Sequence, residues 1–148
     1  MATLQSTNII VFLGRPTLSE MQEVGAQMLQ LAARNPAGIY GYNVIAASAK
    51  MPDADARADI QQGFERLRGK LLASAAVIET TGIAGTLART LVSTLLTVSK
   101  RPFTLRVFAD RASAATWLAG QPGAPSAADL VGIAGTIERK LKAADGGV

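Results

Sequence analysis

The residues best suited to binding chemistry lie in a glycine-rich segment, 80–86, with the sequence Thr-Thr-Gly-Ile-Ala-Gly-Thr. A glycine-rich turn that opens a helix presents free backbone N–H groups to an anion, so Thr81, Gly82 and Gly85 form a candidate anion site. The segment lacks the Gly-Lys-Ser/Thr ending of a Walker A loop and a complete G-x-G-x-x-G pattern. Because short glycine patterns are unspecific, a tight turn with close helix packing is the favoured interpretation of the two glycines.

Arg89 lies one helical turn after Gly85 and could add a charge-assisted contact to the same anion. The helix expected around it is apolar over most of its circumference, which is typical of a buried helix. An arginine on such a helix needs a partner whatever the protein does, and Glu79 or Asp110 could supply one. We favour this structural pairing over the ligand contact.

Ser48 and Lys50 form a second candidate pair, between a predicted strand and a predicted helix. A serine near a lysine could act as a nucleophile and its base, but nothing else in this segment supports catalysis. Carboxylates follow, of which Asp55 and Asp59 share one face of the predicted helix. With Arg57 between them, the solvated start of a helix explains this pattern better than a metal site, which would need more oxygen ligands.

Two absent residue types remove most other chemistry. The chain of 148 residues contains no cysteine and no histidine, which excludes disulfides, thiolate or imidazole metal sites and histidine-dependent triads. The 15 basic and 11 acidic residues give a net charge of +4, but the basic residues are spread along the chain without interleaved aromatic residues. We therefore expect no cofactor, no nucleic-acid partner and no catalytic activity.

Hydrophobic patterning predicts four strands that alternate with helices. This order predicts a single α/β domain with a four- to five-stranded, mostly parallel sheet, flanking helices and an extra C-terminal helix. Parallel strands end at one edge of a sheet, where open α/β sheets usually bind ligands. The strands are expected at residues 8–13, 39–47, 74–80 and 103–108, and helices at 17–34, 53–72, 82–100, 110–118 and 126–144. The candidate ligand-binding residues at the edge are Ser48, Lys50, Thr81, Gly82, Gly85, Arg89 and Asp110.

The segment 105–118, Leu-Arg-Val-Phe-Ala-Asp-Arg-Ala-Ser-Ala-Ala-Thr-Trp-Leu, resembles the terminal strand and helix of SpoIIAA-like proteins. These proteins belong to the STAS (sulfate transporter and anti-sigma-factor antagonist) superfamily. The order of elements over residues 8–118 is also similar to that of the family. The resemblance assigns residues 1–119 to a STAS-like domain. Residues 120–148 then form a linker and a helix that packs on the domain or on a partner.

The resemblance implies a binding or regulatory module and no known reaction. It also implies that Phe108, Ala114 and Trp117 pack in the core. Some family members are anti-sigma-factor antagonists controlled by a phosphorylated serine. Only Ser48 could correspond to that serine, and the family's Asp-Ser-Ser-Gly pattern is absent, so the phosphorylation switch is not carried over. The family usually has an antiparallel strand before the first parallel one, for which residues 1–7 provide no convincing candidate.

We therefore expect a non-enzymatic module that acts through a protein partner, and a homodimer is possible. The alternative is a carrier or sensor of an anionic or lipid-like small molecule at the C-terminal edge of the sheet. A large apolar cavity would favour this alternative, whereas a flat apolar face would favour the protein partner. The longest apolar stretch, residues 87–98, is too short and too often interrupted for a transmembrane segment, so a cytoplasmic location is expected.

Overall fold

The protein forms one five-stranded sheet in which the strands lie in the order of the sequence. The computed structural model describes residues 1–82, 85–86, 89–90 and 104–146. The first strand is antiparallel to the second, and the other neighbouring pairs are parallel. The predicted α/β fold with a mostly parallel sheet is therefore confirmed. The strands are β1 (Ala2–Leu4), β2 (Thr7–Phe12), β3 (Ile39–Ile45), β4 (Leu71–Ile78) and β5 (Thr104–Phe108).

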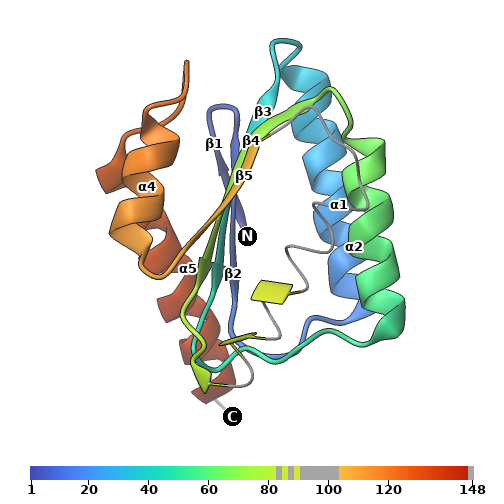
Figure 1. Ribbon diagram of the computed structural model, residues 1–148, viewed down its shortest axis with the longest axis vertical. Coiled ribbons are helices and arrows are strands. Elements are labelled where there is room, and N and C mark those ends of the chain that lie inside the picture. The colour runs from blue at the N-terminus through green and yellow to red at the C-terminus, as the bar shows by residue number, and fades with distance from the viewer. Residues whose placement is uncertain (83–84, 87–88, 91–103, 147–148) are drawn as a thin grey trace.

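Helices cover both faces of this sheet (Figure 1). On one face lie α1 (Leu18–Arg34) and α2 (Ala54–Arg66), which connect parallel strands, and on the other lie α4 (Arg111–Ala119) and α5 (Ala127–Gly146). Side-chain oxygens cap three of them: those of Thr17, Asp53 and Asp110 accept backbone N–H groups at the starts of α1, α2 and α4. Among the helices of the described ranges, none has the length and hydropathy that a bilayer span requires.

The structure differs most from the sequence prediction at the start of the chain and between α2 and β4, which begins at Leu71 and not at residue 74. Residues 1–7 were expected to form no strand, but β1 pairs with β2 through a tight turn in which Gln5 has a φ of 54°. Three residues are too few to show a periodic pattern, so this strand had no signal in the sequence. The helix expected to reach residue 72 ends at Arg66, and Gly69, with a φ of 75°, turns the chain into β4. The helix expected at 82–100 lies mostly outside the described residues.

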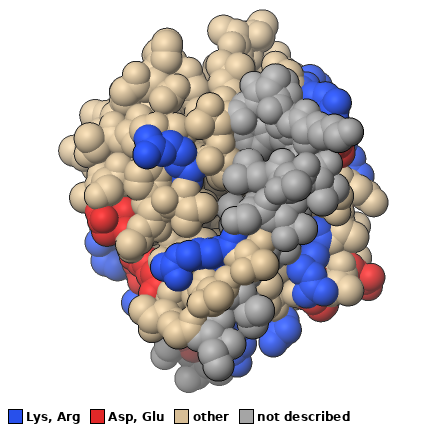
Figure 2. All heavy atoms as spheres, viewed as in Figure 1, with Lys and Arg blue, Asp and Glu red and all other residues tan. Residues whose placement is uncertain are grey.

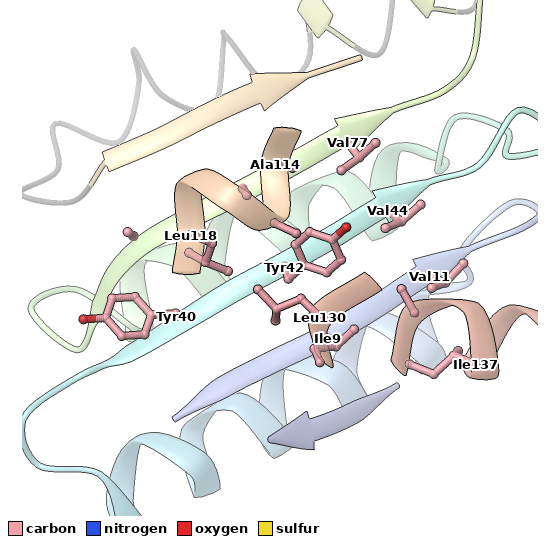
Figure 3. Close-up of a cluster of buried hydrophobic side chains, with 14 residues drawn as sticks. Ile9, Val11, Tyr40, Tyr42, Val44, Val77, Ala114, Leu118, Leu130 and Ile137 are labelled. Carbon is pink, nitrogen blue, oxygen red and sulfur yellow. The ribbon is translucent and has the colours of Figure 1, made fainter. Parts of the chain in front are cut away.

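The main core lies between the sheet and the layer of α4 and α5 (Figure 3). Every second residue of the three central strands points to this side. The hydroxyl of Tyr42 donates to the carbonyl oxygen of Arg111 (2.9 Å), and that of Tyr40 donates to the carbonyl oxygen of Pro122 (2.7 Å). Burial raises the pKa of Tyr42 to about 12. The buried strand residues are Ile9, Val11, Tyr40, Tyr42, Val44, Ala73, Ala75 and Val77.

Helix α5 is part of this core. Leu130 is completely buried, and Ala134 and Ile137 follow it along the helix face that packs against the sheet. From α4, the core receives Ala114 and Leu118, as Figure 3 shows. The C-terminal helix therefore covers hydrophobic strand residues of its own chain.

Trp117 was expected in the core together with Phe108 and Ala114. Ala114 is fully buried, but Trp117 and Phe108 are only partly buried at the border of the core. Their rings lie 5.8 Å apart, and the guanidinium of Arg106 lies 5.6 Å from the centre of each ring. The aromatic pair thus closes the side of the core and contacts a cation at the surface.

Replacing Leu130 by alanine should lower the free energy of unfolding by about 2–5 kcal/mol, because it leaves a cavity beneath α5. The matched control is Leu141→Ala on the same helix, where the side chain is 39% exposed. Denaturant melts of both variants measure the difference. Equal losses below about 1 kcal/mol would contradict the packing of α5 on the sheet.

Candidate functional site

The seven residues expected at the C-terminal edge of the sheet do not form one site. Lys50 contributes to a cavity on the side of α1 and α2, whereas Asp110 caps α4 on the opposite side. The pKa of Asp110 is lowered, mainly by the backbone N–H of Ser113. Helix α4, which follows β5, lies on the other face of the sheet, and this separates Asp110 from Lys50. Ser48, Lys50, Thr81, Gly82 and Arg89 are exposed, and Gly85 is buried.

The two glycines of the candidate anion turn have structural explanations. A Cβ atom at position 85 would overlap the carbonyl oxygen of Thr80, so only glycine fits there. Gly82 has a φ of 67°, a conformation that side chains disfavour, although a Cβ atom would meet open space. Both observations support the turn-and-packing interpretation, and neither requires a bound anion.

An ion-pair network closes the α4/α5 side of the edge. The guanidinium of Arg111 contacts the carboxylate of Glu79 through two nitrogens, at 2.9 and 3.0 Å. One of these nitrogens also lies 2.7 Å from Glu138, which accepts a further contact of 2.9 Å from Lys142. Glu79 was one of the two partners expected for Arg89, and its carboxylate is bonded to Arg111 instead. The network joins the end of β4 to α4 and α5.

These contacts change the pKa values of the network. The hydrogen bonds with Glu79 raise the pKa of Arg111, against the effect of its own partial burial. The hydrogen bond from Lys142, followed by that from Arg111, lowers the pKa of Glu138. The raised pKa of Arg111 and the lowered pKa of Glu138 both favour the charged forms, so at neutral pH an ion pair joins the start of α4 to α5.

On the other face, a cavity of about 200 Å³ lies between the sheet and helices α1 and α2. Its described lining comes from β2, β3, β4 and β5, from both helices and from the loops that follow β2 and β3. Most of this lining is apolar. Large side chains around the space include Ile10, Phe12, Ile45, Met21, Met28 and Phe64.

A few polar side chains also line the cavity. Asn43 donates its amide N–H to the hydroxyl oxygen of Ser74 at 3.0 Å, so these two neighbours on β3 and β4 are bonded to each other. Thr80 is 4% exposed, and its hydroxyl has no hydrogen-bond partner in the described part of the chain. Lys50 and Asp59 add one charge of each sign.

The sequence analysis did not identify these lining residues, although polar residues within the predicted strands were a signal. The register pairs Ile10 with Asn43 and Asn43 with Ala76, so the three residues share one sheet face. Polar residues in the middle of strands that helices cover on both faces are unusual. Asn8, on the same face, is also buried, and its amide atoms have no partner among the described residues. The polar residues of buried strands therefore marked this face.

Two glycines on the helices also line the cavity: Gly25 on α1 and Gly63 on α2. Among the described residues, a Cβ atom at either position would have no neighbour within 4 Å. Neither glycine has a positive φ, so neither is required by backbone conformation or by close helix packing. A glycine within a helix costs about 1 kcal/mol relative to alanine. The missing side chains leave the cavity open.

Neither a group of metal ligands nor a basic surface marks a further site in the described part of the chain. Over the described ranges, no group of three acidic residues could hold a metal ion. On the face drawn in Figure 2, Lys and Arg side chains lie at separate places and form no continuous stripe.

No protein-family model, curated protein or solved structure matches the chain. The function must therefore be inferred from the residues of this chain.

Glu138 should make the stability of the protein depend on pH in acid. Its folded-state pKa is lowered, so its contribution is present above the unfolded pKa of about 4.3 and is lost as pH falls through the folded pKa. The stability advantage of the wild type over Glu138→Gln should therefore shrink between neutral pH and about pH 3. Urea melts across this range measure it.

The control is Glu65→Gln, which removes the charge from an exposed pair with Arg68, where the side chains are 45% and 53% exposed. Exposed pairs contribute little to stability, so this variant should follow the wild type closely. An equal response of both variants to acid would contradict a special role of the Arg111 network.

Proposed function

We propose that this protein is a non-catalytic binding protein for a small, largely apolar molecule held between the sheet and helices α1 and α2. The observation that carries the proposal is the pair of helix glycines that line the cavity, Gly25 and Gly63. Each lowers helix stability, and neither serves a turn or a close contact with another described residue. Keeping space for a ligand gives both glycines a reason.

The size of the cavity limits the ligand. Protein interiors are close-packed, so the apolar side chains around a space of this size lack contacts that a bound molecule would supply. An engineered apolar cavity of about 150 Å³ accepts benzene, and pockets for drug-sized ligands begin at about 300 Å³. At about 200 Å³, the cavity fits a single-ring or short-chain molecule.

The proposal modifies the alternative function expected from the sequence, a carrier or sensor at the C-terminal edge of the sheet. Of the seven candidate residues, only Lys50 lines the cavity. The lining contains no histidine or cysteine, because the chain has none. Binding without a reaction is therefore the simplest function for this site.

A regulatory module that acts through a protein partner is a second candidate. Two observations favour it: the resemblance to STAS proteins and the antiparallel strand β1, which the family usually has and the sequence did not indicate. The last strand, β5, belongs to the resembling stretch, and Val107 on it is 38% exposed. In this second candidate function, a second copy of the chain docks along β5.

Filling the cavity should abolish ligand binding without unfolding the protein. In Gly25→Leu the new side chain enters the cavity, and loss of the helix glycine should also raise the free energy of unfolding by about 0.5–1 kcal/mol. Toluene should raise the melting temperature of the wild type and leave that of Gly25→Leu unchanged. Native mass spectrometry of the purified protein would detect a retained ligand in the wild type alone.

The matched control is Gly132→Leu on α5, where a Cβ atom also meets open space but the residue is exposed and remote from the cavity. This variant should bind toluene as the wild type does. The proposal is wrong if toluene does not stabilise the wild type, or if Gly25→Leu and Gly132→Leu respond alike.

For the second candidate, Val107→Arg should disrupt an association along β5, because a charge would be buried in the interface. Leu141→Arg is the control, since Leu141 is 39% exposed and lies on α5. Size-exclusion chromatography with light scattering would report a dimer that Val107→Arg converts to a monomer. A monomeric wild type would contradict self-association.

A further inference from the structure

We infer that the ligand is neutral and carries one hydrogen-bonding group, such as a hydroxyl, that binds the hydroxyl of Thr80 inside the cavity. The inference rests on the proposed function, and it specifies the chemistry of the ligand and the residue that recognises it. Phenols and small cyclic alcohols have this chemistry.

The first argument is the state of the Thr80 side chain. It is 96% buried, it lines the cavity, and its hydroxyl has no partner among the described residues. An unsatisfied buried hydroxyl is costly, and valine would have the same shape without that cost. A polar group of a ligand in the adjacent space would supply the missing hydrogen bond.

The second argument concerns the other polar side chains of the cavity. Asn43 and Ser74 already form a hydrogen bond with each other, at 3.0 Å. This bond uses one N–H of the Asn43 amide and one lone pair of the Ser74 hydroxyl, whereas no described residue bonds to the hydroxyl of Thr80. In the part of the chain that the structure describes, Thr80 alone combines deep burial, a place in the lining and an unpaired hydroxyl. It is therefore the anchor that the cavity offers.

The third argument is the charge of the lining. Lys50 and Asp59 contribute one positive and one negative charge, so the described lining has no net charge. The buried polar groups are hydroxyls and an amide, which do not neutralise a charged ligand. Burial of an unpaired carboxylate or ammonium group is very unfavourable. A neutral ligand avoids this penalty.

The test compares phenol with toluene, which differ by the hydrogen-bonding group, in the wild type and in Thr80→Val. Isothermal titration calorimetry measures both affinities. We expect Thr80→Val to weaken phenol binding about tenfold, which corresponds to the loss of one buried hydrogen bond. Its affinity for toluene should be unchanged or higher.

Thr7→Val is the matched control. Thr7 is also fully buried, and its hydroxyl has no partner among the described residues. It lies on β2 and does not line the cavity, because alternation places it on the sheet face opposite Asn8 and Ile10. Both variants remove the same group from a buried site. Only Thr80→Val should change the ratio of the two affinities.

The outcomes separate the two proposals. If neither toluene nor phenol binds the wild type, the proposed function fails. If both bind and Gly25→Leu abolishes binding, but Thr80→Val leaves the phenol affinity unchanged, the function stands and the role of Thr80 is wrong. Benzoate provides the last arm: tighter binding of benzoate than of phenol would overturn the inference of a neutral ligand.

Discussion

Alternation of side chains along three buried strands is the constraint on which this structure depends. Because β2, β3 and β4 are covered on both faces, each must supply one row of residues to α4 and α5 and another to α1 and α2. The first row contains large residues such as Tyr42 and is tightly filled. The second contains Asn43, Ser74 and Ala76, and leaves a cavity. One face of the sheet is therefore filled by large side chains, and the other borders a cavity.

The end of β4 connects these two faces. Glu79 and Thr80 are consecutive, so their side chains point to opposite sides: Glu79 to Arg111 and the α4/α5 layer, Thr80 to the cavity. The Arg111 network fixes the position of Glu79 through α4 and α5. It thereby holds the backbone on which Thr80 is presented. Contacts in the layer on one side of the sheet thus help to position Thr80 on the other side.

Of the elements that the structure describes, the sequence predicted all but β1, because periodicity reports burial on one or two faces. It did not predict that the candidate residues at the edge of the sheet lie on two faces. Helix α4 follows β5 and leads to no further strand. The right-handed crossover rule, which places α1 and α2 on one face, therefore says nothing about α4, Asp110 or Arg111. The cavity was also beyond the sequence, because spacing along a chain does not give the distance between a helix and a sheet. Thr80 is adjacent to Thr81, which was a candidate residue, but Thr80 is buried and Thr81 is exposed.

The single tryptophan lies in only one of the two helix layers, so its fluorescence can distinguish them. Trp117 lies on α4, beside Phe108 and the guanidinium of Arg106, on the opposite side of the sheet from the cavity. Its fluorescence therefore reports the environment of the α4/α5 layer, and a molecule in the cavity cannot quench it by contact. Any change in emission that accompanies ligand binding would have to pass through the sheet. The indole is thus an intrinsic probe of communication between the two layers.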